Sequence, residues 1–171
     1  MSSFDLTQYK VVAAQDIEAA AKSGAKEILY ILGSTPDWAA KYVRPDKYYY
    51  GGGTASEPAK LAYWRDWVRA VATRYKGRIT SYQIWNEANL ASFWAPERPK
   101  HWVRMARLTE IAAEEIRAVD RRAKVVSASS TVIQGSEEYC WNTIPARIPD
   151  SWTGFSRSST CPEVGFCKPA I

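Results

Sequence analysis

An asparagine–glutamate pair, Asn86-Glu87, is the part of the sequence best suited to do chemistry. It directly follows an apolar segment at residues 79–85, and two aromatic residues, Phe93 and Trp94, come shortly after it. A protonated carboxyl group can donate to the leaving oxygen of a glycosidic bond, and a neighbouring amide can hydrogen-bond a sugar hydroxyl. Aromatic rings add flat apolar faces for the C–H surfaces of a sugar. The pair therefore suits glycoside hydrolysis, and the plain alternative is a carboxylate that faces solvent or caps a helix.

A carboxylate in this role needs a strand that ends just before it, and the sequence predicts three strands. Residues 27–32 are a nearly continuous apolar run, which is typical of a strand buried on both faces of a parallel sheet. Residues 79–85 and 124–129 are the second and third predicted strands. The C-terminal ends of such strands are where (β/α) barrels place their catalytic residues.

Three helices are predicted, one before each strand. The first spans residues 11–23 and ends at Gly24, which suits a C-terminal cap. The second begins with Ser56 as its N-cap and ends at Gly77, and the third follows Pro99. Both later helices carry an apolar stripe at helical spacing. The stripes are, in turn, Leu61, Trp64, Val68, Val71 and Tyr75, and Trp102, Met105, Leu108, Ala112, Ile116 and Val119.

The alternation of helices and strands predicts an α/β fold with a parallel sheet and right-handed crossovers. The loops after the first two strands, at residues 34–57 and 86–99, are long, and in a (β/α) barrel such loops build the active-site face. Trp38 and Trp94 lie in these loops, so each is a candidate sugar-binding ring beside the Asn-Glu pair. A place in the hydrophobic core is the alternative for both tryptophans.

Four segments stand out together: Thr35-Pro36-Asp37-Trp38-Ala39, Gly51-Gly52-Gly53, Trp64-Arg65-Asp66-Trp67-Val68 and Tyr82-Gln83-Ile84-Trp85-Asn86-Glu87. Within roughly residues 4–135 the chain resembles clan A glycoside hydrolases, most closely the cellulase-like and family 39 xylosidase-like (β/α)8 barrels. The resemblance implies that the three strands are the third, fourth and fifth of eight. It also implies retaining hydrolysis of O-glycosidic bonds, with Glu87 as the acid/base and Asn86 as a substrate-binding residue. An oligo- or polysaccharide is the implied substrate, and no cofactor or metal is expected.

The sequence departs from this family in two respects. The proline that usually follows the glutamate is replaced by Ala88, and the family's nucleophile, a second glutamate after the seventh strand, has no clear counterpart. The later glutamates, Glu137, Glu138 and Glu163, follow no apolar strand of suitable length. Retention needs two carboxyl groups about 5–5.5 Å apart, so we expect the chain alone to be inactive. A non-catalytic carbohydrate- or partner-binding fragment is the alternative.

The character of the sequence changes after about residue 139. Residues 140–171 contain all three cysteines and four of the nine prolines, and they have no periodic apolar pattern. We therefore expect a partial TIM-barrel domain over residues 1–139 and an irregular tail over 140–171. The abrupt change motivates the hypothesis that the tail is read out of frame in a truncated gene product. Three cysteines in such a tail do not describe a disulfide framework.

Composition and sequence patterns limit the binding partners and the location that we expect for the protein. The net charge is +5, but Lys and Arg are interspersed with Asp and Glu and no nucleic-acid-binding motif accompanies them, so nucleic acid is not an expected partner. No run of 18 apolar residues exists, so no membrane span is expected. The N-terminus lacks a signal-peptide pattern, which makes a cytoplasmic location the default while leaving localisation open. Three strands cannot close a barrel, and we expect the exposed sheet edges to favour self-association.

Overall fold

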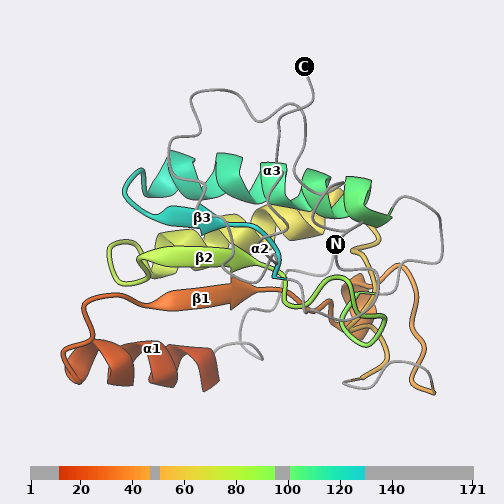
Figure 1. Ribbon diagram of the computed structural model, residues 1–171, viewed down its shortest axis with the longest axis horizontal. Coiled ribbons are helices and arrows are strands. Elements are labelled where there is room, and N and C mark those ends of the chain that lie inside the picture. The colour runs from red at the N-terminus through yellow and green to blue at the C-terminus, as the bar shows by residue number, and fades with distance from the viewer. Residues whose placement is uncertain (1–11, 47–50, 95–100, 130–171) are drawn as a thin grey trace, which may run out of the picture.

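The computed structural model describes residues 12–46, 51–94 and 101–129 (Figure 1). The elements in chain order are α1 (Val12–Lys22), β1 (Leu29–Leu32), the short 3-10 helix η1 (Asp37–Ala39), α2 (Leu61–Arg74), β2 (Ser81–Ile84), α3 (His101–Val119) and β3 (Lys124–Val126). The predicted alternation of helices and strands is confirmed, although each strand is shorter than predicted. The predicted tail at 140–171, with its cysteines, and the later glutamates lie outside the described residues.

The three strands form one parallel sheet in the order β1-β2-β3 (Figure 1). Tyr30, Tyr82 and Val125 are partners across the sheet, so these three side chains share one face. The helices α2 and α3 are the crossovers that join β1 to β2 and β2 to β3. The predicted α/β class with a parallel sheet is therefore confirmed. No helix in the described part of the chain is long and apolar enough to cross a membrane.

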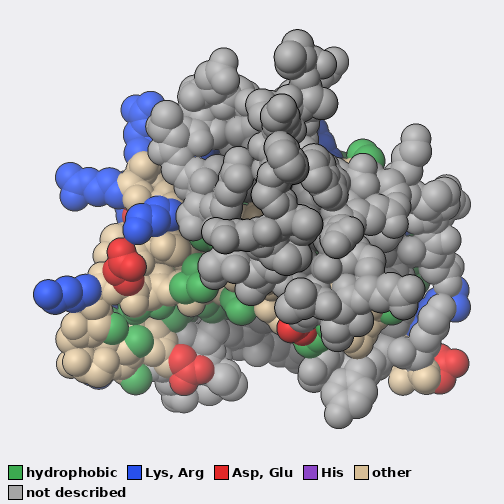
Figure 2. All heavy atoms as spheres, viewed as in Figure 1, with side chains coloured by type: hydrophobic (Ala, Val, Ile, Leu, Met, Phe, Trp, Pro, Cys, Tyr) green, Lys and Arg blue, Asp and Glu red, His purple; other side chains and the backbone are tan. Residues whose placement is uncertain are grey.

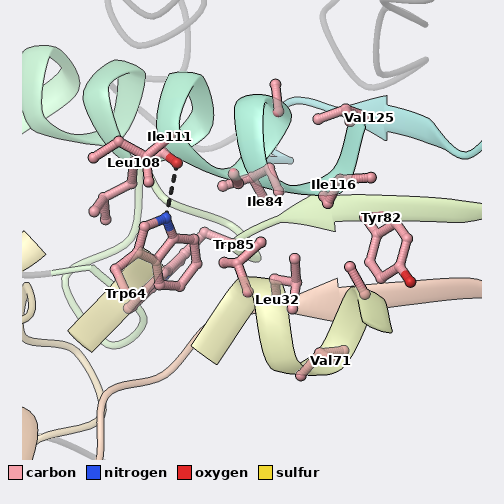
Figure 3. Packing of buried hydrophobic residues seen from close by; sticks show 14 of the residues in the cluster. Leu32, Trp64, Val71, Tyr82, Ile84, Trp85, Leu108, Ile111, Ile116 and Val125 are labelled. Atoms are coloured by element: carbon pink, nitrogen blue, oxygen red, sulfur yellow. Dashed lines mark hydrogen bonds between the residues drawn. The ribbon is translucent and has the colours of Figure 1, made fainter. Parts of the chain in front are cut away.

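The core lies between α2, α3 and the face of the sheet that carries Tyr82 (Figure 3). Aromatic and aliphatic side chains from both helices and all three strands fill it, and Trp64 of α2 donates its indole N–H to the carbonyl oxygen of Leu108 on α3 at 2.9 Å. The predicted helix faces are confirmed where the structure describes their side chains, except that Leu61 is 46% exposed and Val119 is only partly buried. The residues buried as predicted are Trp64, Val68, Val71, Tyr75, Met105, Leu108, Ala112 and Ile116.

The opposite face of the sheet is open at β1. Leu32 is fully buried, whereas Leu29 and Ile31 are 54% and 45% exposed. The prediction that residues 27–32 are buried on both faces is therefore wrong for the described structure. The physical reason is that α2 and α3 pack on one face only, and alternate residues of a strand point to opposite faces.

Two helix ends test the capping predictions. Gly24 has φ +85°, and the N–H groups of Gly24 and Ala25 donate to the carbonyl oxygens of Ala21 and Ala20, which confirms a glycine C-cap on α1. The prediction that Ser56 is the N-cap of α2 is wrong, because Lys60 occupies that position. Ser56 is instead fully buried in the preceding loop.

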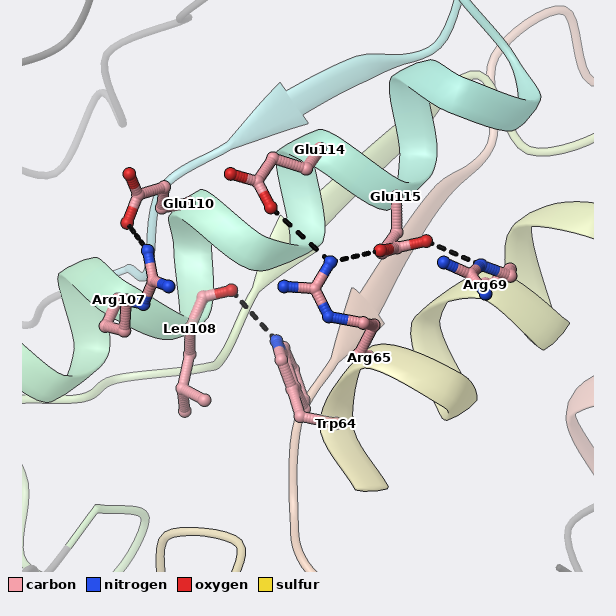
Figure 4. A network of polar contacts seen from close by, with 8 residues as sticks. All are labelled: Trp64, Arg65, Arg69, Arg107, Leu108, Glu110, Glu114 and Glu115. Atoms are coloured by element: carbon pink, nitrogen blue, oxygen red, sulfur yellow. Dashed lines mark hydrogen bonds and ion pairs between the residues drawn. The ribbon is translucent and has the colours of Figure 1, made fainter. Parts of the chain in front are cut away.

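Charged side chains join the outer surfaces of α2 and α3 (Figure 4). Glu115 is only 3% exposed and lies between Arg69, at 2.7 Å, and Arg65, at 2.5 Å. The hydrogen bond from Arg69, supported by Arg65, holds the pKa of the Glu115 carboxyl below its ordinary value of 4.5. A buried carboxylate paired with two guanidinium groups thus fixes the two helices against each other.

Candidate active site

The backbone is strained at the carboxyl end of the sheet. Ser34 follows β1 with φ +62°, and Trp85 and Glu87 follow β2 with φ +68° and +40°. In the described ranges these three are the non-glycine residues with positive φ, a conformation that side chains with a Cβ adopt at an energetic cost. Strain of this kind clusters at functional sites because the surrounding structure must enforce it.

Trp85 fixes the point at which the chain leaves the sheet. Its backbone N–H donates to the carbonyl oxygen of Leu32 at 2.6 Å, which extends the pairing of β1 and β2 by one residue. Its side chain is 2% exposed, and its indole N–H donates to the carbonyl oxygen of Phe93 at 2.7 Å. A Cβ atom at Gly33 would lie only 3.3 Å from the Trp85 Cα, so the two strand ends approach closely. The Asn-Glu pair therefore begins from an anchored residue.

Ser129, just beyond β3, joins the Asn-Glu pair to the neighbouring strand. Its Oγ accepts a hydrogen bond from the backbone N–H of Glu87 at 2.9 Å and lies 3.1 Å from Oδ1 of Asn86, to which it donates. The Ser129 carbonyl oxygen accepts from the backbone N–H of Ala88 at 3.0 Å. Three consecutive residues after β2 are thus held by one residue after β3.

Gln83, on β2, completes this network. Its Nε2 donates to the carbonyl oxygen of Trp85 at 2.9 Å and to Oγ of Ser129 at 3.2 Å. Gln83 lies in register with Ile31 and Val126, on the face of the sheet opposite to the helical layer. The side chains of Gln83, Asn86 and Ser129 therefore meet at the carboxyl end of the sheet, next to Glu87, on the face opposite to α2 and α3.

The two candidate aromatic residues have different surroundings. Trp38, in η1, is 57% exposed, and its ring meets the edge of Tyr63 at 5.6 Å between centroids. Trp94 is 3% exposed and packs edge-on against Trp85 at 4.8 Å. Trp38 therefore offers ring surface to solvent, whereas Trp94 supports the anchored Trp85 and has almost no ring surface open to a ligand in this structure.

The loop that carries Trp38 is tightly folded. The Asp37 carboxylate accepts from the backbone N–H of Gly53 at 2.7 Å, and Oγ1 of Thr35 donates to the carbonyl oxygen of Ser56 at 2.6 Å. A Cβ atom at Gly53 would lie 2.7 Å from the Ala40 Cβ, which explains the glycine there. An apolar pocket separates this loop from α2. Its lining residues include Pro36, Trp38, Pro58, Tyr63, Trp64 and Trp67.

Glu57 ties the same loop to α3. Glu57 is 8% exposed, and its carboxylate pairs with Lys41 at 2.6 Å and with Arg104 of α3 at 3.3 Å. Asp37 and Glu57 are therefore two acidic residues whose contacts hold this loop. Among the described residues, no three His, Cys, Asp or Glu side chains gather closely enough to hold a metal ion.

No protein-family model matches the chain. A monomeric β-xylosidase from Caulobacter crescentus CB15 has a similar structure, with a TM-score of 0.56 and 25% identity over 75% of this chain. A GH39 β-xylosidase from Caulobacter crescentus gives a TM-score of 0.57 with 24% identity over 79% of the chain. A GH39 enzyme from Xanthomonas axonopodis pv. citri gives 0.57 with 23% identity over 82%. The chain is similar to family 39 glycoside hydrolases.

The chain is also similar in sequence to a known protein, and the similarity covers only part of each relative's length. A β-xylosidase from Geobacillus stearothermophilus is 26% identical over 98 residues, which cover 53% of this chain. The chain spans only 18% of that relative and 25–30% of the three structural neighbours. The predicted resemblance is confirmed, and so is the fold class: three parallel strands with their helices form part of a TIM barrel like that of the family 39 neighbours.

The sequence assigned no functional role to two residues of the network, Gln83 and Ser129. No local pattern marks Gln83 or Ser129, since each meets its partners only through the register of parallel strands. Two weak signals exist. Gln83 is a polar residue inside an apolar strand, and Ser129 follows the neighbouring strand at the same edge as the Asn-Glu pair.

Proposed function

We propose that the chain carries the acid/base half of a retaining glycoside hydrolase site that acts on xylose-containing oligo- or polysaccharides. The single observation behind this proposal is the placement of Asn86-Glu87. The pair directly follows β2, at the carboxyl end of a parallel sheet, and Ser129 connects it to the next strand. The similarity to proteins described as β-xylosidases supports the substrate class.

In the proposed reaction the Glu87 carboxyl group donates its proton to the glycosidic oxygen as that bond breaks. The anomeric carbon bonds to a second carboxylate, and a covalent glycosyl-enzyme results. The Glu87 carboxylate then takes a proton from water, whose oxygen displaces the second carboxylate with overall retention. The Asn86 amide donates to a sugar hydroxyl, and the exposed ring of Trp38 stacks on a sugar further along the substrate.

We propose further that the chain by itself turns over little or no substrate. A retaining reaction needs a second carboxyl group about 5–5.5 Å from the first. The resemblance predicts that group after the family's seventh strand, and it assigns the three described strands to the third, fourth and fifth positions. Two of the described acidic residues of the neighbouring loop, Asp37 and Glu57, are engaged in hydrogen bonds or ion pairs that hold that loop.

An assay of the purified chain with an aryl β-xyloside tests the inactivity. We expect turnover no faster than in Glu87→Gln. Robust turnover that Glu87→Gln abolishes would refute the inactivity while supporting the role of Glu87. The matched control is Glu27→Gln, because Glu27 is a 72%-exposed carboxylate at the opposite end of the sheet.

The role of Glu87 is tested in a chimeric barrel. It joins this chain to the parts of the monomeric β-xylosidase from Caulobacter crescentus CB15 that the chain does not match. Replacing Glu87 by Ala should slow cleavage of xylobiose by about 10²-fold or more, the usual contribution of a general acid. An aryl xyloside with a good leaving group needs less protonation, so its cleavage should fall less. Equal losses on both substrates would count against Glu87 as the acid.

A carbohydrate-binding fragment without catalysis is the second candidate. The observation that favours it is the 57% exposure of Trp38, whose ring lies beside Tyr63. Calorimetry with xylotriose tests this candidate. Binding that Trp38→Ala removes and Glu87→Gln leaves intact would favour a binding function centred on Trp38.

A further inference from the structure

The hydroxyl group of Ser129 has its full set of hydrogen bonds within the Asn-Glu network. It receives one from the backbone N–H of Glu87 and another from Nε2 of Gln83, at 2.9 and 3.2 Å. A serine hydroxyl has two acceptor sites and one hydrogen. Both acceptor sites are therefore occupied, and the single hydrogen is left for the third neighbour, Asn86.

This count of donors and acceptors at the Ser129 hydroxyl determines the orientation of the Asn86 amide. The third neighbour of Ser129 Oγ lies 3.1 Å away and must be an acceptor, so it is the Oδ1 atom of Asn86. Gln83 reinforces the arrangement, because its Nε2 is also engaged by the carbonyl oxygen of Trp85 and so must be a nitrogen. The Nδ2 group of Asn86 consequently faces away from Ser129 with its two hydrogens.

The same residue holds the backbone of the carboxylate. Glu87 has φ +40°, a conformation that a residue with a Cβ leaves readily unless its surroundings enforce it. The hydroxyl of Ser129 binds the Glu87 N–H, and the carbonyl oxygen of Ser129 binds the Ala88 N–H at 3.0 Å. Ser129 therefore contacts the chain on both sides of the Glu87 side chain.

We propose that Ser129 is the positioning residue of the Asn86-Glu87 pair. It turns the Asn86 amide so that Nδ2 donates to a sugar hydroxyl, and it holds Glu87 in the left-handed conformation that directs its carboxyl group. This inference rests on the proposed function for its substrate, but its geometric part concerns the free protein. Ser129 itself neither touches the substrate nor transfers a proton.

The test compares three variants of the full chain. Ser129→Ala removes the hydroxyl, Ser129→Thr retains it, and Ser81→Ala is the matched control at the other end of the neighbouring strand. In nuclear magnetic resonance experiments we expect Ser129→Ala to speed exchange of the Glu87 amide hydrogen about tenfold, the equivalent of one hydrogen bond. The Nδ2 resonances of Asn86 should also move. Ser129→Thr and Ser81→Ala should resemble the wild type, and the Trp85 amide, bonded to Leu32, serves as internal reference.

Calorimetry with xylobiose supplies the functional readout. Ser129→Ala should weaken binding about tenfold, because an amide free to rotate presents the wrong atom part of the time, and Ser129→Thr should restore it to within about twofold. Binding lost in Asn86→Ala but unchanged in Ser129→Ala would overturn the positioning role and leave the proposed function standing. If the wild type binds no xylobiose, the proposed function fails, and the Asn86 resonances decide alone: unchanged resonances in Ser129→Ala overturn the inference.

Discussion

At the scale of single residues, the structure gives a quantitative reason for the network around Glu87. A left-handed conformation costs a residue with a Cβ about 1–2 kcal/mol. Each hydrogen bond to the backbone N–H groups of Glu87 and Ala88 contributes about 0.5–1.5 kcal/mol. The two terms are of similar size, so two bonds to Ser129 are enough to offset the strain, and loss of either leaves it poorly compensated.

Replacing Glu87 by glycine should therefore stabilise the protein relative to Glu87→Ala. Both variants lack the carboxyl group, but glycine adopts φ +40° without the Cβ clash, so we expect its free energy of unfolding to be higher by about 0.5–1 kcal/mol. Urea denaturation followed by circular dichroism measures the difference. Equal stability of the two variants would mean that the backbone at this position carries no strain.

At the scale of elements, the clearest energetic feature is the charged contact between α2 and α3. Glu115 and Asp120 both have a lowered pKa, the first through Arg69 and Arg65 and the second through the backbone N–H groups of Gly77 and Arg122. A lowered pKa in the folded state means that the unfolded chain binds the proton more tightly. Both groups thus contribute stability that is complete above their ordinary pKa values and is lost as the pH falls through the folded ones.

The midpoint of thermal unfolding should consequently be nearly constant from pH 7 to pH 5.5 and fall steeply below the ordinary glutamate pKa of 4.5. Glu115→Gln should lower the midpoint at neutral pH, because Arg65 and Arg69 lose their shared partner, and should flatten the fall in acid. Glu110→Gln, on an exposed position of the same helix, is the control and should keep the wild-type profile. A Glu115→Gln profile parallel to the wild type would remove Glu115 from the explanation.

Helical periodicity and apolar runs were enough to predict the order of the elements and most of the core. Trp64 and Leu108, for example, occupy apolar stripes that are visible in the sequence and are both buried. The start of α2 was missed because Ser56 has the composition of an N-cap but is used inside the loop, where its hydroxyl accepts from the Tyr42 N–H and donates to the Glu57 carbonyl oxygen. Local sequence preference cannot reveal such a distant partner.

The candidate site, like the fold, was predicted only in part from the sequence. Asn86-Glu87 was recognisable because the strand that places it is adjacent in sequence. Ser129 was not recognised as its partner, because 42 residues separate it from Glu87 and only the pairing of β2 with β3 brings them together. The burial of Trp94 depends likewise on where Trp85 points, which a left-handed residue changes abruptly.

At the scale of the whole molecule, the described part of the chain differs from a complete barrel on the face of its sheet opposite to α2 and α3. Within the described ranges β1 and β3 are the edges of the sheet, and Leu29 and Ile31 are exposed on the face opposite to α2 and α3. Exposed apolar residues next to unpaired strand edges favour association with further copies. On the coloured part of the face drawn in Figure 2, Lys and Arg side chains lie near Asp and Glu side chains.

Ile31→Lys should reduce self-association of the purified chain. The side chain is 45% exposed, so the substitution should change the free energy of unfolding by no more than about 0.5 kcal/mol. Light scattering over a range of concentrations should give a lower average mass for the variant than for the wild type. Val103→Lys adds the same charge at a 53%-exposed position on α3 and should leave the mass distribution unchanged. A wild type that is monomeric at all concentrations would contradict this prediction.

The separation between Glu87 and Ser129 also sets the order of events during synthesis. A ribosome completes Glu87 42 residues before it reaches Ser129, and α3 must be made in between. Until β3 has emerged and paired with β2, the Glu87 N–H lacks its bond to the Ser129 hydroxyl. Without that bond, Ser129 does not hold Glu87 in the left-handed conformation. The carboxylate is therefore translated early but oriented late, and a ribosome-bound chain arrested before residue 129 would carry the complete Asn-Glu motif without its geometry.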